Sequence, residues 1–112
     1  MEDKKQQDIN LAMELIAGAG DSRSYCMEAI EEAREGNFDV AKEDVNQAAK
    51  AMVNTHEVQT NLIRDEISGE SDSSVSLLMV HAQDHLNLAL IMRDVAEELI
   101  TIYERLKKLE GE

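Results

Sequence analysis

The sequence of 112 residues contains no proline and no tryptophan, and aromatic residues make up only 3% of it. Without proline, no residue in the chain is bound to break a helix, while alanine, methionine and glutamate are plentiful. This composition is typical of long helices that pack through small side chains. We therefore expect an all-α fold.

Only one cysteine is present, Cys26, so an internal disulfide is impossible. A chain without disulfides suits a reducing compartment, and we expect a cytoplasmic protein. Cys26 lies on an apolar stripe of the expected first helix, and we see no basic group placed to lower its pKa. We expect it to be a small buried side chain rather than a nucleophile.

Long apolar runs and basic residues are also scarce. No run approaches the length of a membrane span, and the start of the chain has no apolar signal region, so we expect a soluble protein. The 11 basic residues face 24 acidic ones, for a net charge of −13. This charge disfavours nucleic acid and anionic membranes as partners and favours a protein with a basic face.

Apolar residues recur at helical spacing along the chain, and we expect helices over about 5–34, 38–67 and 75–109. At the first turn, Gly36 suits the left-handed residue that ends a helix, and Asn37 suits the next N-cap. Asp39, Glu43 and Asp44 are expected to place negative charge near the positive end of the second helix. Gly18 and Gly20 interrupt the first helix, but the stripe phase carries through, so we expect it to be continuous. The expected core stripes are Ala12, Leu15, Ala19, Cys26, Ala29 and Ala33 in the first helix, and Phe38, Ala41, Val45, Ala48, Met52, Thr55, Gln59 and Leu62 in the second.

The third helix carries two apolar stripes side by side, which is wider than one partner helix can cover. We expect it to pack inside its own bundle and against another subunit. The first stripe is Leu78, Ala82, His85, Ala89, Met92, Ala96, Leu99, Tyr103 and Leu106. The second is Leu77, His81, Asp84, Leu88, Ile91, Val95, Glu98, Ile102, Arg105 and Leu109.

Short connections make consecutive helices antiparallel. The sequence therefore predicts one domain over residues 1–112, built as an up-down-up three-helix bundle.

A polar cluster, His81, Asp84 and His85, lies in the first turns of the third helix. Residues at i, i+3 and i+4 share a helical face, so these side chains can act together. Three interpretations are open: a metal site, a histidine that accepts a phosphoryl group with Gln83 and His85 in support, or a polar layer that fixes helix register. His56 stands alone on the second helix, and we favour a structural or partner-facing role for it.

The segment from Leu78 to Leu86, LMVHAQDHL, resembles the active-site segment of the lactose/cellobiose (N,N′-diacetylchitobiose) class of enzyme IIA of the bacterial phosphoenolpyruvate-dependent sugar phosphotransferase system. The turn at residues 35–38 and the segment from His56 to Ile63 resemble the same family, in order and over nearly the whole chain.

The resemblance implies a homotrimer in which the third helices pack like a coiled coil. It implies that His81 accepts a phosphoryl group on Nε2 from the carrier protein HPr and passes it to a cysteine of the cognate IIB. The membrane protein IIC then couples this transfer to uptake of a β-linked disaccharide of the lactose, cellobiose or chitobiose type. Asp84 matches an aspartate that clusters at the trimer axis, where one Mg²⁺ can bind, and Gln83 and His85 match residues that support the phosphoryl group.

Asn87 departs from the family pattern, since we expect methionine or another apolar residue there. This departure bears on the contact with IIB, and the sequence leaves the particular sugar undetermined. Two other functions stay open from the residues alone. One is a two-component histidine phosphotransfer domain, which is usually a monomeric four-helix bundle, and the other is a trimeric helical adaptor without chemistry.

Overall fold

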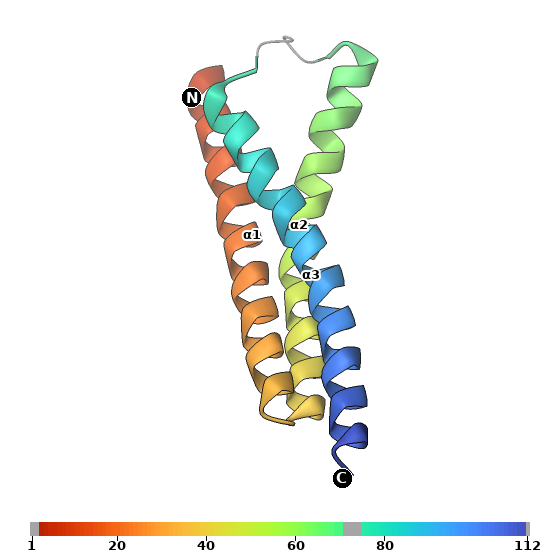
Figure 1. The fold of residues 1–112 in the computed structure, drawn as a ribbon. Helices are drawn as coiled ribbons and strands as arrows, with labels where there is room; N and C mark the ends of the chain where they lie inside the picture. Colours follow the sequence, from red (N-terminus) through yellow and green to blue (C-terminus); the bar gives the residue numbers. More distant parts are fainter. Residues whose placement is uncertain (1–2, 71–74, 112) are drawn as a thin grey trace.

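The computed structural model describes residues 3–70 and 75–111. Three helices follow one another: α1 (Lys4–Arg34), α2 (Phe38–Ser68) and α3 (Leu77–Leu109). They run up, down and up as a rod with extents of 62 × 24 × 20 Å (Figure 1). The predicted all-α three-helix fold is confirmed, and each helix begins and ends within two residues of its expected bounds.

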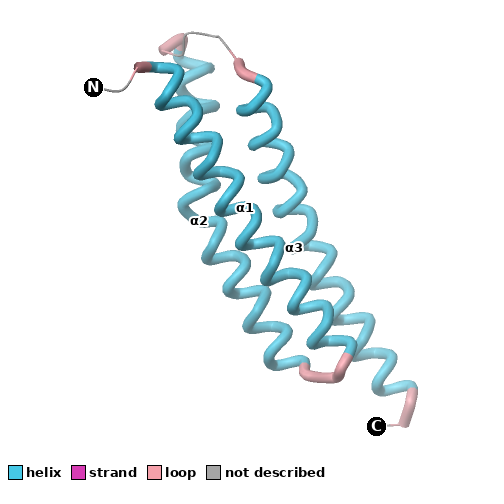
Figure 2. Tube along the Cα trace, turned by 90° about the vertical axis from the view of Figure 1, so that its left-hand side faces the viewer, coloured by secondary structure: helices cyan, strands magenta, loops and turns pink. Residues whose placement is uncertain are grey.

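The helix α1 packs against both of the others, whereas α2 and α3 contact each other much less. Figure 1 shows why: the C-terminal half of α2 diverges from the N-terminal half of α3, and the lower halves lie close together. The view turned by 90° shows the three helices running the length of the rod without a break (Figure 2).

Small side chains allow α1 to approach α2 closely. Every residue of the stripe predicted for α1 is buried, and Ser22 on that side donates a hydrogen bond to the carbonyl oxygen of Ala48 at 3.0 Å. A Cβ at Gly18 would overlap the side chain of Thr55. The glycine is therefore a point of close approach within a continuous helix, not a break.

The two ends of the bundle differ in how their helices are capped. Gly36 has a φ of +86°, as the turn after α1 requires. Asn37 occupies the N-cap position of α2, but its side chain makes no capping hydrogen bond, and its amide nitrogen donates to Glu32 at 2.9 Å. At the other end, Ser76 caps α3 by accepting a hydrogen bond from the backbone N–H of Met79 at 3.0 Å.

Asp44, near the start of α2, is buried, which helical spacing did not predict. Only 8% of the residue is exposed. It lies between the core positions Ala41 and Ala48, and this spacing turns it toward α1.

Candidate functional site

The start of α3 is fixed against α1 by a short hydrogen-bond chain. Ser76 accepts from Met79, and its own hydroxyl donates to a carboxylate oxygen of Asp8 at 2.8 Å. This pairing could not be predicted from spacing, because Asp8 and Ser76 are far apart along the polypeptide. These hydrogen bonds matter for the site, because His81 lies only five residues after the cap at Ser76.

His81 and His85 form a contacting pair on α3. Their Nε2 atoms lie 3.1 Å apart, and the rings meet edge to face with centroids 4.5 Å apart. His81 is exposed and His85 is half-buried. This distance allows a hydrogen bond in which Nε2 of one ring donates and Nε2 of the other accepts, and the tautomers determine which ring is the donor.

Gln83 lies away from this pair. Its side-chain oxygen accepts a hydrogen bond from Gln59 of α2 at 2.8 Å, and its nitrogen lies 3.9 Å from the sulfur of Met79. Consecutive helical residues are turned by about 100°, so two residues along the helix point to nearly opposite sides. The structure therefore brings His81 and His85 together in one chain but leaves Gln83 on the side that faces α2.

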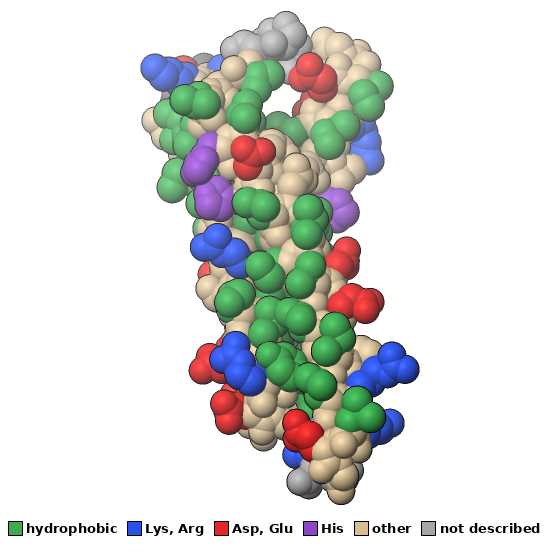
Figure 3. Space-filling view, viewed as in Figure 1, with side chains coloured by type: hydrophobic (Ala, Val, Ile, Leu, Met, Phe, Trp, Pro, Cys, Tyr) green, Lys and Arg blue, Asp and Glu red, His purple; other side chains and the backbone are tan. Residues whose placement is uncertain are grey.

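Asp84 is exposed and shares a face of α3 with large apolar side chains. Ile91 on this face is 59% exposed. The stripe predicted second for α3 is exposed along its whole length, and Figure 3 shows hydrophobic side chains running down this face of the rod. We call it the α3 face, and it is made of Leu77, Asp84, Leu88, Ile91, Val95, Ile102 and Leu109. A continuous apolar surface of this kind marks an interaction site.

His56 is exposed on α2, as are Val53, Ile63 and Ile67. Its own side chain therefore contributes little to the core of one chain. Figure 3 shows a pair of histidines on one side of the hydrophobic surface and a single histidine on the other.

Cys26 is fully buried, as expected. Burial raises the pKa of its thiol, and the charge of Arg93 offsets this only in part. Spacing along the sequence did not reveal Arg93 as a neighbour, because it comes from α3. A thiol that stays protonated is a poor nucleophile, so Cys26 belongs to the core.

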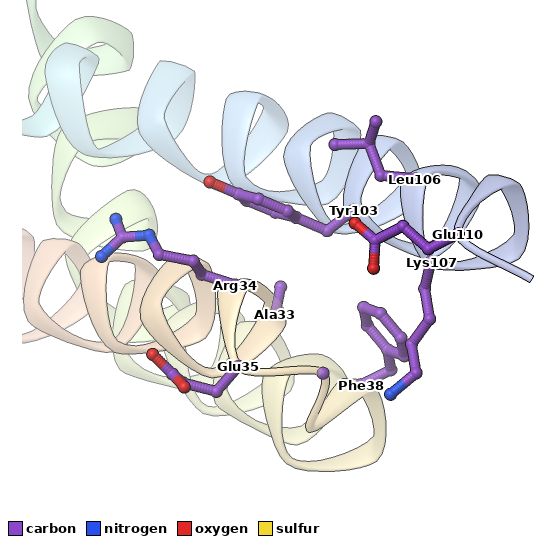
Figure 4. A pocket seen from close by; sticks show the side chains of 9 residues that line it. Ala33, Arg34, Glu35, Phe38, Tyr103, Leu106, Lys107 and Glu110 are labelled. Atoms are coloured by element: carbon purple, nitrogen blue, oxygen red, sulfur yellow. The ribbon is translucent and has the colours of Figure 1, made fainter. Parts of the chain in front are cut away.

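A pocket of about 320 Å³ lies at the opposite end of the rod, between the turn after α1 and the last turns of α3. Figure 4 shows Arg34 and Lys107 with Glu35 and Glu110 around an apolar floor that includes Phe38. Its mixed charges give no preference for one sign of ligand. Within the described residues, no group of three or more His, Cys, Asp or Glu side chains could hold a metal ion. In the same part of the chain no helix is both long and apolar enough to cross a membrane.

Comparison with protein families matches residues 10–104 to the family described as PTS system, Lactose/Cellobiose specific IIA subunit. The lactose-specific EIIA component of Staphylococcus epidermidis is 40% identical over 95 residues, which cover 85% of this chain and 90% of that protein.

Two solved structures resemble the whole bundle. The cellobiose-specific enzyme IIA from Bacillus anthracis has a TM-score of 0.85 at 35% identity, and the match covers 96% of this chain and 95% of that one. The second is IIA(Chitobiose) of Escherichia coli in its complex with HPr. It has a TM-score of 0.74 at 35% identity and covers 96% of this chain and 99% of that one.

Proposed function

We propose a function from one premise: this chain belongs to the lactose/cellobiose-specific IIA subunit family of the phosphotransferase system. It is thus a phosphotransferase component. The function is that of a cytoplasmic phosphocarrier, in which His81 holds the phosphoryl group between two transfers. The observation that carries this proposal is an exposed imidazole on a capped helix, with a second imidazole 3.1 Å from its Nε2.

In the first transfer, the lone pair of His81 Nε2 attacks the phosphorus of phosphohistidine in HPr. A new N–P bond forms, the N–P bond to the donor histidine breaks, and that histidine keeps the electron pair. In this step the ring proton of His81 is on Nδ1 and its Nε2 lone pair accepts a hydrogen bond from Nε2–H of His85; after the attack, the same N–H of His85 donates to a phosphoryl oxygen. The protein supplies position and hydrogen-bond donors, which is what phosphoryl transfer mainly needs.

In the second transfer, a cysteine thiolate of the cognate IIB attacks the same phosphorus, and His81 leaves with its electron pair. HPr as donor is supported by the relative solved in complex with it. The sugar would be a β-linked disaccharide of the lactose, cellobiose or chitobiose type, and IIC would select it. The net charge of −13 favours partners that present basic residues around their own active sites.

The α3 face supports the proposed homotrimer. Its apolar residues extend from the first turn of α3 to its last, and they are exposed among the described residues of a single chain. Packing three α3 helices around a common axis would bury the α3 face of each chain in a coiled-coil-like interface. A bundle of three helices also fits this assembly better than a monomeric phosphotransfer domain, which usually has four.

The proposed Mg²⁺ depends on the same assembly. Within the described residues of one chain the carboxylate of Asp84 has no companions that could hold a cation. Three copies around the axis would supply three carboxylates, and oxygen ligands of this kind suit Mg²⁺. The ion would neutralise charge between the subunits and take no part in the transfer.

The proposal is tested by incubating the protein with phosphoenolpyruvate, enzyme I and HPr and measuring an acid-labile phosphate. Wild-type protein should take up one phosphate per chain, and His81→Ala should take up none. The exposed variant Asp94→Ala on the same helix should behave like wild type. Phosphate uptake by His81→Ala at the wild-type rate would show that another residue is the acceptor.

A further inference from the structure

We infer that His56 of a second copy of this chain completes the phosphoryl site, by facing His81 across the boundary between two subunits. This inference rests on the proposed phosphocarrier function and on the assembly through the α3 face. It gives a role to a histidine that lies away from the His81–His85 pair within its own chain.

The first step is the position of His81 on α3. Tyr103 lies 22 residues further along, which is roughly 40° from the direction of His81 at 100° per residue. Tyr103 lies beside Arg34 of α1, and the two side chains line the same pocket (Figure 4). The flank of the α3 face that holds His81 is therefore the flank on the side of α1. Gln83, bonded to Gln59 of α2, marks the opposite flank.

The second step is the position of His56 on α2. Lys42 reaches α3 by an ion pair with Glu104 at 3.1 Å, so its direction marks the side of α2 that faces α3. His56 comes 14 residues later and points within about 40° of that direction. It is nevertheless exposed. On the same side of α2 lie Val53, which is 66% exposed, and Ile67, which is 81% exposed. We call Val53, His56 and Ile67 the row on α2.

The third step is the height along the rod. The hydrogen bond between Gln59 and Gln83 places these two residues at the same level. His56 lies three residues from Gln59, and His81 and His85 each lie two residues from Gln83. At 1.5 Å per residue, all three histidines fall within about one helical turn of that level. Figure 3 shows the pair and the single histidine at similar heights on opposite sides of the hydrophobic surface.

A second copy fits this surface better than any other occupant. Rotation about an axis that runs along the α3 face, parallel to the rod, keeps every residue at its own height. It brings the α1 flank of one copy against the α2 flank of the next. Apolar side chains then meet apolar side chains from both helices, and His81 meets His56 at the same level. The row on α2 thereby continues the proposed assembly face.

The chemistry of the site needs such a residue. A phosphoryl group brings about two negative charges next to Asp84, in a chain whose net charge is already −13. Among the described residues of one chain, His85 is the partner placed on Nε2 of His81. An N–H of the neighbouring copy's His56 would donate a second hydrogen bond to the phosphoryl oxygens. His56 forms and breaks no covalent bond in either transfer.

Mixed assemblies test the inference. The measurement is the rate of phosphate uptake from phospho-HPr per intact His81. His56→Ala alone should react about tenfold more slowly than wild type, as the loss of one charge-assisted hydrogen bond implies. When His56→Ala is assembled with an excess of His81→Ala, each intact His81 has neighbours with intact His56, and the wild-type rate should return.

The matched control is assembly of His56→Ala with an excess of the double variant, His56→Ala with His81→Ala. Those neighbours offer no His56, so the rate should stay low. His56→Gln, which keeps an N–H donor, should react at an intermediate rate and serves where His56→Ala does not assemble. A wild-type rate for His56→Ala, or a slow rate that the His81→Ala neighbours do not restore, overturns the inference. Failure of wild-type protein to accept phosphate would instead overturn the proposed function.

Discussion

At the scale of single residues, two carboxylates of this acidic chain depart from the role of a solvated charge. Asp84 is exposed but lies among apolar side chains, and Asp44 is buried against α1. One carboxylate oxygen of Asp44 is inaccessible to solvent and has no hydrogen-bond partner. Burial raises the pKa of its carboxyl group, and the charges of Glu28, Glu32 and Glu43 raise it further. An uncompensated buried charge of this kind costs stability.

Asp44→Asn should therefore stabilise the protein at pH 7. The folded state binds a proton to Asp44 more tightly than the unfolded state does, so the wild type loses stability as pH rises above the usual aspartate range. The variant lacks this loss, and its advantage should be on the order of 1 kcal/mol at pH 7 and vanish below about pH 4. Urea unfolding at a fixed protomer concentration between pH 3 and 8 measures both effects.

The exposed variant Asp94→Asn provides the control and should leave the pH dependence unchanged. A destabilised Asp44→Asn at neutral pH would show that the charged form of Asp44 is the one that the fold requires.

At the scale of helices, spacing predicted which residues are buried but not which helices share a hydrogen bond. The stripe from Ala12 to Ala33 is buried throughout, because a period of 3.6 residues determines one side of a helix regardless of its neighbours. The family resemblance assigned Gln83 a role in supporting the phosphoryl group, but spacing did not predict its hydrogen-bond partner within the chain. The hydrogen bond between Gln83 and Gln59 depends on which side of α3 packs against α2. The spacing of apolar residues does not determine how the helices are arranged around the bundle.

The same limit applies to helix ends. Asn37 and Ser76 both occupy N-cap positions and both are residue types that cap, yet only the side chain of Ser76 accepts a backbone hydrogen bond. The ψ of Asn37 is 68°, whereas that of Ser76 is 155°, in the extended range typical of a capping residue. The tight turn with Gly36 takes Asn37 out of the capping conformation, and the residue type alone does not show this.

Ser76→Ala should lower the free energy of unfolding by about 1 kcal/mol, because Met79 loses its capping acceptor and Asp8 loses its partner. Asn37→Ala should lower it by less, since only an exposed hydrogen bond to Glu32 is lost. Denaturant unfolding of both variants measures the difference. Equal losses would mean that the hydrogen bonds of Ser76 add nothing beyond those of an ordinary surface side chain.

At the scale of the whole molecule, the rod leaves one long apolar side uncovered, and the sequence predicted this from the double stripe of the third helix. Single-chain packing accounts for the first stripe, whose members Ala82, Ala89 and Ala96 are buried. It does not account for Leu88, Ile91 and Val95, which remain exposed. The oligomer proposed here is what covers them.

Asp84→Leu should keep the trimer intact and make it insensitive to chelators. The substitution removes three clustered charges and adds apolar area, which contributes about 1.5 kcal/mol or more per buried leucine. Wild-type trimer should weaken when EDTA removes the proposed Mg²⁺, because the carboxylates then repel one another. Sedimentation at several protein concentrations, with and without EDTA, measures the assembly. Dissociation of Asp84→Leu would show that the carboxylates themselves are needed to hold the subunits together.

The use of a single exposed nitrogen, Nε2 of His81, for both proposed transfers has a consequence for the rate of the relay. In the proposed relay, HPr would bring a phosphoryl group to Nε2 of His81 and a cysteine of IIB would remove it, so the two proteins would compete for the same surface around each His81. They would then bind in turn, and slow release of either partner would limit the turnover of the relay. A mutation that tightens the binding of HPr or IIB would slow dissociation of that partner, and it would therefore slow sugar uptake.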